Sequence, residues 1–396
     1  MQSLGLILAS VCFPFLIIIR WFFKERFRKI QNQPLLVVLG SGGHTGEMLL
    51  LLEAIEHVNF FPRTYVVAAS DSGVNSSRQK ITQFEKNNNK NNTKWSVETI
   101  TRAREIGQTS SKFLLTSIIA TLEAFIQSLT IVYKCRPKLL LCNGPGTCIP
   151  VCFAVLLFNI LGLTETKIVY VESFACVSKL SRSGEILYYL RLTHAFCVLW
   201  KDLLSKYPRS HLLSTFSNEE TTQNPINGKR GGYVLATVGS TSFDELIQKL
   251  DDQQVSKVLL QKGYRSMHFQ IGQSQIHPRH AEIPGKFSVE EFSFKESMVD
   301  EIKGASLVIS HGGAATTLEA LLNQTPLVLV PNEKLMNNHQ LQLVAKVAHL
   351  GYAFCLRTSD NFPELLQSFD TSKLRSFTNF VDKGKLSSVL RNTLIS

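Results

Sequence analysis

Short apolar runs alternate with helix-like patterns along most of the chain. This alternation predicts parallel β-sheets flanked by helices, because parallel strands are buried on both faces and need long crossover connections. In the first half the predicted strands are 35–39, 64–69, 97–100, 138–142, 167–171 and 195–199, and the predicted helices are about 45–57, 111–134 and 148–162. In the second half the predicted strands are 233–238, 267–271, 288–294, 306–310 and 327–331, and the predicted helices end near 250 or cover about 296–303, 314–323 and 337–350.

The stretch STFSNEETTQNPINGKRGG, residues 214–232, contains almost nothing that could be buried, which indicates a linker. With 396 residues the chain is long enough for two separate cores. Two such α/β domains would place a ligand crevice at the carboxyl ends of their strands. The predicted division is an anchor with its basic flank at 1–30, a first domain at 31–213, the linker at 214–232, a second domain at 233–360 and a tail at 361–396 that folds back onto the first domain.

The N-terminal segment has the composition of a membrane anchor. Residues 4–19 are uncharged and apolar, and the RWFF that follows extends the run to 20 residues, about 30 Å as a helix. Basic KERFRK follows the run and nothing basic precedes it, so the positive-inside rule places the rest of the chain in the cytosol. A monotopic or re-entrant anchor is the alternative, and it leaves that side unchanged.

Charge is concentrated in the first half. Residues 1–213 carry 24 Lys and Arg against 13 Asp and Glu, a net charge of +11, whereas residues 214–396 carry 18 against 18. A basic half suits anionic lipid headgroups; a solvated basic face or a nucleic-acid patch is the alternative, but no nucleic-acid-binding motif is present. The apolar stretch 148–163 is read as a buried core helix, with shallow membrane insertion as the other possibility.

The eight cysteines lie mostly in apolar surroundings without C-x-x-C pairs or zinc-ligand spacing, which indicates reduced core residues. The sequence also has no Asp-x-Asp pair, so it gives no signal for a metal held on a donor diphosphate. Charge developing on a leaving group would then be stabilised by helix N-termini and backbone amides.

Two glycine-rich loops follow strands and open helices. VVLGSGGHTGEML (37–49) is not a G-x-G-x-x-G fingerprint, because Thr45 occupies the third glycine position and Gly46 comes one place late. ISHGGAATTLEALL (309–322) contains the second loop and the helix that follows it, with Glu319 about two turns into that helix. Each loop predicts an anion site at a helix N-terminus. The alternatives are a tight connection without a ligand, capping by the threonines of the second loop, and a solvated Glu319.

Several longer runs carry a specific resemblance. TVGSTSFDELI (237–247), LVISHGGAATTLEALL (307–322) and NEKLMNNHQLQL (332–343) resemble the catalytic subunit of the eukaryotic UDP-N-acetylglucosamine transferase that makes the second step of dolichol-linked oligosaccharide assembly. VVLGSGGHTGEML, LLLCNGPGTCIPVC (139–152), IVYVES (168–173) and KDLLSKYP (201–208) resemble its membrane-anchoring subunit. The two subunits therefore look fused, with the anchor half first.

The resemblance implies an α/β fold of the GT-B glycosyltransferase type, two Rossmann-like domains facing a cleft, with an N-terminal membrane anchor helix. The second domain would bind UDP-GlcNAc as the donor substrate, and no cofactor is expected. By similarity to the bacterial GlcNAc transferase of peptidoglycan precursor synthesis, Glu319 would hold the ribose. The other implied donor-binding residues are Gly239, Ser240, Thr241, His311, Gly312, Gly313 and Thr316 around the diphosphate and Asn338, His339 and Gln340 around the sugar. The bacterial motif has a basic residue where this chain has His311, so a phosphate contact there depends on protonation.

The first domain would recognise the lipid acceptor, dolichyl-diphospho-GlcNAc. The implied acceptor-binding residues are Gly40, Ser41, Gly42, Gly43, Thr45, Asn143, Gly144 and Gly146. An inverting transfer needs one base for the proton of the acceptor's 4-hydroxyl. His44 is the candidate base; the competing interpretation is that it only hydrogen-bonds the acceptor pyrophosphate, and Glu172 is the next candidate.

These features predict a GlcNAc transferase on the cytosolic face of the endoplasmic reticulum membrane, with the preceding enzyme of the dolichol pathway as a possible partner and no nucleic acid. Transfer to another lipid acceptor is the alternative among enzymes, and a catalytically silent membrane scaffold is the alternative of a different class. The tail motif SSVLRNTLI (387–395) is expected to pack on the first domain as a helix.

Overall fold

A computed structural model gives the fold of the chain. It describes residues 33–40, 42–55, 60–71, 76–88, 93–102, 113–214, 232–295, 298–333, 339–377 and 379–395. The predicted anchor (1–30), Ser41, Asn338 and all but the ends of the predicted linker lie outside these ranges. Within them, no helix combines the length and the apolar character needed to cross a membrane.

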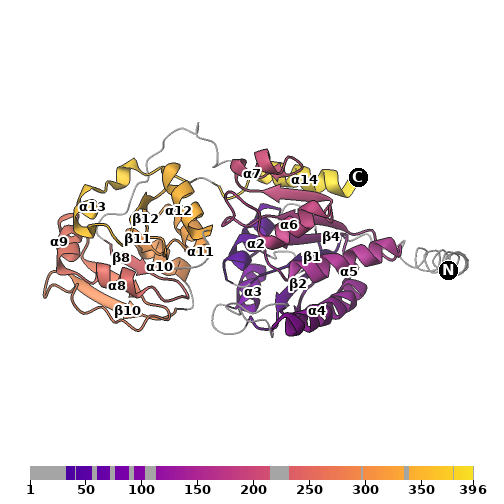
Figure 1. The fold of residues 1–396 in the computed structure, drawn as a ribbon, viewed down its shortest axis with the longest axis horizontal. Helices are drawn as coiled ribbons and strands as arrows, with labels where there is room; N and C mark the ends of the chain where they lie inside the picture. Colours follow the sequence, from indigo (N-terminus) through magenta and orange to yellow (C-terminus); the bar gives the residue numbers. More distant parts are fainter. Residues whose placement is uncertain are drawn as a thin grey trace, which may run out of the picture.

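The first domain is built on a seven-stranded parallel sheet in the order β3-β2-β1-β4-β5-β6-β7 (Figure 1). Its first four strands in the chain are β1 (Leu35–Val38), β2 (Arg63–Ala68), β3 (Trp95–Ile100) and β4 (Leu139–Asn143). The remaining three are β5 (Lys167–Val171), β6 (Ala195–Val198) and β7 (His211–Leu212). β1 and β4 lie side by side in the middle, with Leu35 opposite Leu139, so the chain reverses its direction of travel across the sheet there. The carboxyl ends of these two strands are therefore the place where a ligand crevice is expected.

Right-handed crossovers then decide which helices share a face of the sheet. α2 (Gly43–Ala54) and α3 (Ser77–Asn88) connect strands toward β3. α4 (Phe113–Cys135), α5 (Cys148–Ile160) and α6 (Arg182–Tyr189) connect strands in the other direction and so cover the opposite face. α7 (Lys201–Lys206) precedes β7.

The second domain repeats this plan with a six-stranded parallel sheet in the order β10-β9-β8-β11-β12-β13. Its strands are β8 (Val234–Thr237), β9 (Ser266–Gln270), β10 (Ser288–Phe292), β11 (Leu307–Ser310), β12 (Leu327–Leu329) and β13 (Phe354–Cys355). Its helices are α8 (Asp244–Leu250), α9 (Gln253–Gln261), α10 (Met298–Gly304), α11 (Ala314–Leu322), α12 (His339–His349) and α13 (Phe362–Ser368), followed by a 3-10 turn at Thr371–Lys373. The predicted fold class of two parallel α/β domains is confirmed.

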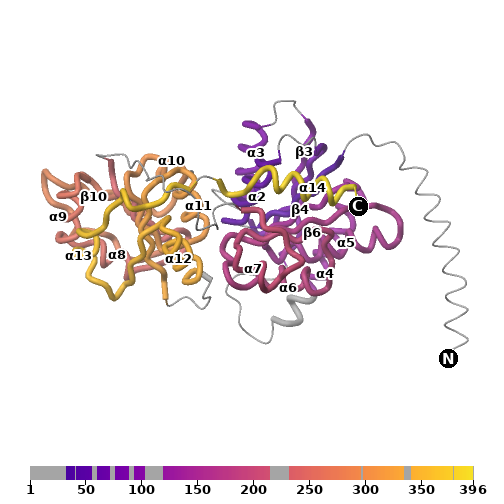
Figure 2. The backbone as a smooth tube through the Cα atoms, turned by 90° about the horizontal axis from the view of Figure 1, so that it is seen from above, coloured from indigo at the N-terminus to yellow at the C-terminus, as the bar shows by residue number. Residues whose placement is uncertain are grey.

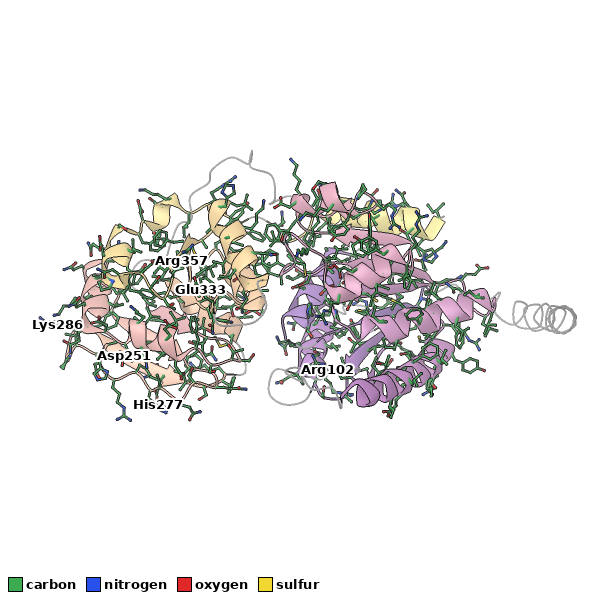
Figure 3. All side chains as sticks on the ribbon, in the orientation of Figure 1. Arg102, Asp251, His277, Lys286, Glu333 and Arg357 are labelled. Atoms are coloured by element: carbon green, nitrogen blue, oxygen red, sulfur yellow. The ribbon has the colours of Figure 1, made fainter. Side chains whose placement is uncertain are left out.

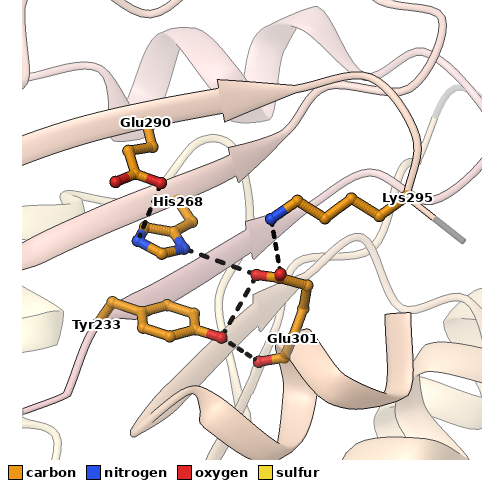
Figure 4. A network of polar contacts seen from close by, with 5 residues as sticks. All are labelled: Tyr233, His268, Glu290, Lys295 and Glu301. Atoms are coloured by element: carbon orange, nitrogen blue, oxygen red, sulfur yellow. Dashed lines mark hydrogen bonds and ion pairs between the residues drawn. The ribbon is translucent and has the colours of Figure 1, made fainter. Parts of the chain in front are cut away.

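A polar network holds the start of the second domain in place (Figure 4). The Tyr233 ring stacks on His268 with centroids 3.8 Å apart, and its hydroxyl donates to the backbone carbonyl of Glu301 at 2.7 Å. Glu301 also accepts a hydrogen bond from Lys295 Nζ at 2.6 Å. The chain leaving the linker region is thus fixed to β9 and α10.

The C-terminal segment returns to the first domain. Figures 1 and 2 both show α14 (Lys383–Ile395), the last helix, lying on the first domain. It packs against β5 and β6, with Leu386 and Leu390 fully buried, and the Asp382 amide donates to the Leu213 carbonyl at 2.8 Å. α2 and α3 cover only the part of this face over β1 to β3. The part over β5 and β6 is left open by these helices, and α14 covers it.

Candidate functional site

The glycine-rich loop after β1 ends in the first turn of α2. Gly42 has a φ of +66°, a conformation that favours glycine, and α2 begins at the next residue without a side-chain cap. The Thr45 hydroxyl instead turns back to the Gly40 carbonyl at 2.5 Å and lies 2.5 Å from Ser77 Oγ. Thr45 is fully buried, so its predicted acceptor contact is replaced by a role in closing the loop.

His44 lies between two glycines. A β-carbon on Gly40 would come within 2.9 Å of His44 Cβ, and one on Gly144 would come within 2.7 Å of His44 Cε1 and 2.9 Å of its Nδ1. The loop after β4 therefore packs directly against the imidazole. Among the described residues, His44 Nδ1 is buried and has no hydrogen-bond partner. The fold therefore encloses this nitrogen without giving it a hydrogen-bond partner among the described residues.

The other acceptor-side residues divide into open and buried positions. A β-carbon on Gly146 would meet no atom within 4 Å, so the backbone of this residue is approachable. Asn143 is fully buried and donates to Glu47 Oε2 at 3.2 Å and to the Val171 carbonyl at 3.3 Å. The Nδ2 atom of Asn143 therefore links α2, β4 and β5, whereas its Oδ1 atom has no partner among the described residues, and its contact with the acceptor stays a prediction.

Glu172 is also corrected. It is fully buried, and its carboxylate accepts from the Ser173 amide at 2.9 Å, the Ser181 amide at 2.9 Å and the Tyr170 hydroxyl at 3.2 Å. Burial raises the pKa of this carboxyl group, partly offset by those hydrogen bonds. A side chain enclosed in this way does not reach a substrate hydroxyl, so His44 is the remaining candidate base.

In the second domain the loop after β8 is held by a residue that sequence reasoning missed. Gln270 accepts from the Gly239 amide at 2.9 Å and donates to the Gly239 carbonyl at 2.6 Å. Beyond Gly239, Ser240 is exposed and Thr241 donates to the Val238 carbonyl at 2.9 Å. Only its position at the carboxyl end of β9, the strand beside β8, could have indicated Gln270.

His311 lies between two glycines of the second domain. A β-carbon on Gly239 would lie 2.6 Å from its Cε1, and one on Gly313 would lie 2.5 Å from its Nε2. Burial lowers the pKa of His311 to about 4, and the Thr237 carbonyl 3.3 Å from Nδ1 only partly opposes this. The protonation on which a phosphate contact depended is therefore absent at neutral pH, and His311 acts as a neutral ring that fixes both loops.

The first turn of α11 is the second helix N-terminus of the site. Gly312 has a φ of +82°, and Gly313 precedes the helix without a side-chain cap. Thr316 is half-buried, whereas Thr317 is fully buried and its hydroxyl has no partner among the described residues. Glu319 is half-buried, and burial raises its pKa while the charge of Lys80 in the first domain acts against this.

The two helix N-termini meet between the domains. A β-carbon on Gly43, the first residue of α2, would lie 3.2 Å from the Ala315 β-carbon near the start of α11. Farther along, Ser178 Oγ donates to Gln342 Oε1 at 2.6 Å, and Lys346 pairs with Asp202 at 2.9 Å. The positive ends of two helix dipoles thus face one region, which favours phosphate groups.

The loop expected to bind the sugar is described only in part. Asn338 lies outside the described residues, and of His339 only the backbone is described. Gln340 is half-buried, with its Oε1 unpartnered among the described residues.

Two other histidines of the second domain, His277 and His280, pair with carboxylates outside the candidate site. Figure 3 shows Asp251, His277 and Lys286 at the outer side of the second domain, away from the first domain. There His277 pairs with Glu291 at 2.9 Å and His280 with Asp251 at 2.9 Å. Across the described ranges, no three His, Cys, Asp or Glu side chains gather as a metal-binding group.

Comparisons with solved structures support the two-domain arrangement. MurG of Acinetobacter baumannii is 16% identical, covers 90% of this chain and 95% of that one, and gives a TM-score of 0.54. UDP-GlcNAc 2-epimerase of Methanocaldococcus jannaschii is 13% identical, covers 92% and 100%, and gives a TM-score of 0.56. At these identities the likeness concerns the fold alone, two α/β domains as in GT-B glycosyltransferases.

Sequence comparisons divide the chain at the linker. Residues 35–216 match the family described as "Oligosaccharide biosynthesis protein Alg14 like", and residues 233–381 match "Glycosyltransferase family 28 C-terminal domain". UDP-N-acetylglucosamine transferase subunit ALG13 of Mus musculus is 39% identical over 125 residues, which is 31% of this chain but 11% of that protein.

The subunit ALG14 relatives are matched over most of their length. The protein of Yarrowia lipolytica is 38% identical over 182 residues, 46% of this chain and 80% of that protein. The human protein is 40% identical over 185 residues, 46% of this chain and 81% of that protein. The chain therefore belongs to the family of UDP-N-acetylglucosamine transferase subunit ALG14, and a glycosyltransferase family 28 domain follows in the same chain.

Proposed function

We propose that this protein is an inverting glycosyltransferase that moves GlcNAc from UDP-GlcNAc to dolichyl-diphospho-GlcNAc, forming a β1,4 linkage. The observation that carries the proposal is the contact between the N-termini of α2 and α11 at Gly43 and Ala315. One helix comes from the half that matches subunit ALG14, and the other from the half that matches glycosyltransferase family 28. A single chain thereby supplies both sides of the cleft.

Each side of the cleft has a distinct task in this reaction. The N-terminus of α11 with Gly312 and Gly313 faces the donor diphosphate, and Glu319 accepts hydrogen bonds from the ribose hydroxyls. The amides of the loop Gly40–Gly43 face the acceptor diphosphate. Fixed backbone dipoles stabilise the charge that develops on departing UDP without having to reorganise during the reaction.

His44 takes the proton of the acceptor's 4-hydroxyl in this proposal. Its place in the first turn of α2, beside the α2–α11 contact, supports that role. The competing role of the same imidazole is a hydrogen bond to the acceptor diphosphate. In either case the sequence gives no signal for a metal ion held on the donor diphosphate, because it has no Asp-x-Asp pair.

The first domain also has a surface suited to the membrane. Among the described residues, nine of the thirteen exposed large apolar side chains lie on α4, α5 and α6, helices that pack in sequence on one face of the sheet, and a tenth, Leu190, directly follows α6. They are Ile119, Leu122, Ile126, Tyr133, Phe153, Leu157, Ile160, Ile186, Tyr189 and Leu190. An apolar face on the basic half of the chain fits a bilayer with anionic headgroups. We propose that this face contacts the endoplasmic reticulum membrane beside the anchor at 1–30, with both domains on the cytosolic side.

The membrane role is tested by how the acceptor is presented. The full chain with Leu122→Ser, Ile126→Ser and Leu157→Ser should show a higher KM for an acceptor in phosphatidylserine-containing vesicles. Its KM for a short-chain acceptor in detergent should stay as in the unchanged protein. Phe294→Ser, a change of an equally exposed residue in the second domain, is the control. Equal KM values for all three proteins in vesicles would refute the proposed face.

The reaction is tested by UDP release from UDP-GlcNAc with phytanyl-diphospho-GlcNAc and EDTA present. Activity that survives EDTA and collapses in His44→Ala and Glu319→Ala would support a metal-independent transferase with both sites placed correctly. His277→Ala, at the outer side of the second domain, should remain fully active. Bound UDP-GlcNAc without product would favour another lipid acceptor or a scaffold.

A further inference from the structure

Glu47 is a buried carboxylate one turn after His44, and the sequence motifs assign it no role. Its side chain is only 3% exposed. Oε1 accepts from Ser173 Oγ at 3.0 Å, and Oε2 accepts from Asn143 Nδ2 at 3.2 Å and from the Phe174 amide at 3.1 Å. One side chain of α2 thereby joins the helix to the carboxyl ends of β4 and β5, segments 96 to 127 residues away in the chain.

These bonds fix both surfaces that enclose the His44 imidazole. The first surface is α2 itself, because His44 and Glu47 are three residues apart on adjacent turns of that helix. The second is the loop after β4, where Gly144 follows Asn143 and packs on the imidazole. A β-carbon on Gly144 would also lie 3.3 Å from Ser173 Cβ, so this loop is held between the imidazole and a partner of Glu47.

We propose that Glu47 is a positioning residue for His44, an inference that rests on the proposed function. Glu47 does not touch the substrates; it sets the distance between the imidazole on α2 and the loop that carries Gly144. Without Glu47, three buried donors would lose their acceptor, and each would turn toward another partner or admit water. The loop would move away from α2, and the imidazole would lose its fixed orientation.

The proposal depends on hydrogen-bond geometry rather than on charge. In Glu47→Gln the amide oxygen still accepts from Asn143 and Phe174, and the amide nitrogen donates to Ser173 once that hydroxyl reverses its direction. Glu47→Ala removes all three bonds, and Ser173→Ala removes one. The expected order of kcat is therefore unchanged protein, Glu47→Gln, Ser173→Ala and Glu47→Ala.

A matched control separates positioning from general weakening of the domain. Asn159 also makes three hydrogen bonds: it donates to the Thr166 carbonyl at 2.8 Å and accepts from Thr164 Oγ1 at 2.7 Å and the Thr166 amide at 2.9 Å. It lies near the C-terminus of α5, where the chain enters β5, and so at the amino ends of the strands rather than their carboxyl ends. Asn159→Ala removes as many bonds as Glu47→Ala without touching either loop.

The experiment measures kcat and both KM values for the full chain and these variants. Glu47→Ala should lower kcat about 10²-fold, the effect of misplacing a reacting group by about 1 Å. The KM for UDP-GlcNAc should stay within about twofold, because the donor side is untouched. Glu47→Gln should recover most of the activity, and Asn159→Ala should retain it. An unchanged kcat in Glu47→Ala, or an equal loss in Asn159→Ala, would overturn the proposal.

A second readout does not need turnover. The imidazole NMR resonances of His44, identified by their absence in His44→Asn, should shift in Glu47→Ala and stay in place in Glu47→Gln. If the unchanged protein transfers no sugar, the proposed function fails, and the resonances still test the positioning. If Glu47→Ala does not fold, Ser173→Ala supplies the same comparison, and resonances unmoved in that variant would refute the inference.

Discussion

Three glycines with nearly the same positive φ allow the cost of that φ to be separated from the cost of displacing a neighbouring ring. Gly144, Gly239 and Gly285 have φ values of +68°, +69° and +69°. An added β-carbon would meet His44 at 2.7 Å on Gly144 and His311 at 2.6 Å on Gly239, but on Gly285 it would meet nothing within 4 Å. Alanine at each position therefore has to adopt the same unfavourable φ, and only the first two changes also displace a histidine.

The expected destabilisation follows from these contacts. A positive φ costs an alanine about 1–2 kcal/mol, and at Gly285 no steric contact adds to this cost. A contact under 3.0 Å with a ring also forces the ring or the loop to shift, an overpacking cost of about 1–3 kcal/mol. Gly144→Ala and Gly239→Ala should therefore lose about 2–5 kcal/mol of unfolding free energy. At about 2–4 °C per kcal/mol for a domain of this size, each Tm falls by several degrees more than in Gly285→Ala.

The decisive measurement is steady-state kinetics beside thermal unfolding. Gly144→Ala should lower kcat nearly as far as His44→Ala while UDP-GlcNAc binding persists. Gly239→Ala should weaken UDP-GlcNAc binding, because the donor loop and His311 move together. Gly285→Ala should keep both at the level of the unchanged protein. If Gly144→Ala and Gly285→Ala have the same kcat at a temperature where both are folded, the packing of His44 against Gly144 does not matter for catalysis, and the reasoning is refuted.

Three further predictions concern pH and the tail. Since the pKa of His311 is lowered from 6.5 to about 4, the unfolded state binds the extra proton between these values; stability should fall as pH drops from 6.5 to 4, by up to about 3 kcal/mol, and His311→Asn should flatten this dependence in pH-resolved denaturation. Burial raises the pKa of Glu301, but the hydrogen bond and charge of Lys295 outweigh burial and lower this pKa below 4.5. The stability that the Glu301 carboxylate contributes is therefore present above pH 4.5 and is lost as the pH falls further. Because Lys295 is partly exposed, Glu301→Gln should remove less than about 1 kcal/mol of this acid sensitivity. Leu390→Ala in α14 should cost about 2–5 kcal/mol in thermal unfolding, whereas Ile395→Ala, 80% exposed in the same helix, should cost almost nothing; equal effects would mean that α14 does not hold the first domain.

Much of the secondary structure could be predicted from the sequence. The predicted strands 138–142 and 167–171 correspond to β4 and β5, and the predicted helix 314–323 to α11. Buried parallel strands read as continuous apolar runs, and glycine-rich turns mark the helices that follow them, so local patterns suffice. The prediction missed the helices α3, α6, α7, α9 and α13. It also missed the two-residue edge strands β7 and β13, which are too short to show a period.

The sequence by itself determined the two glycine loops, the histidine in each and the identity of the family. It could not show that Thr45, Asn143 and Glu172 face inward, or that His311 is too buried to be charged, because burial depends on segments far away in the chain. Glu47 and Gln270 follow the same rule: their partners are β-strand ends brought near only by the parallel sheets. Local patterns fix which elements form and where ligands can approach, but only the packing of distant strands decides which polar groups remain free for chemistry, since every buried group that finds a partner is withdrawn from it.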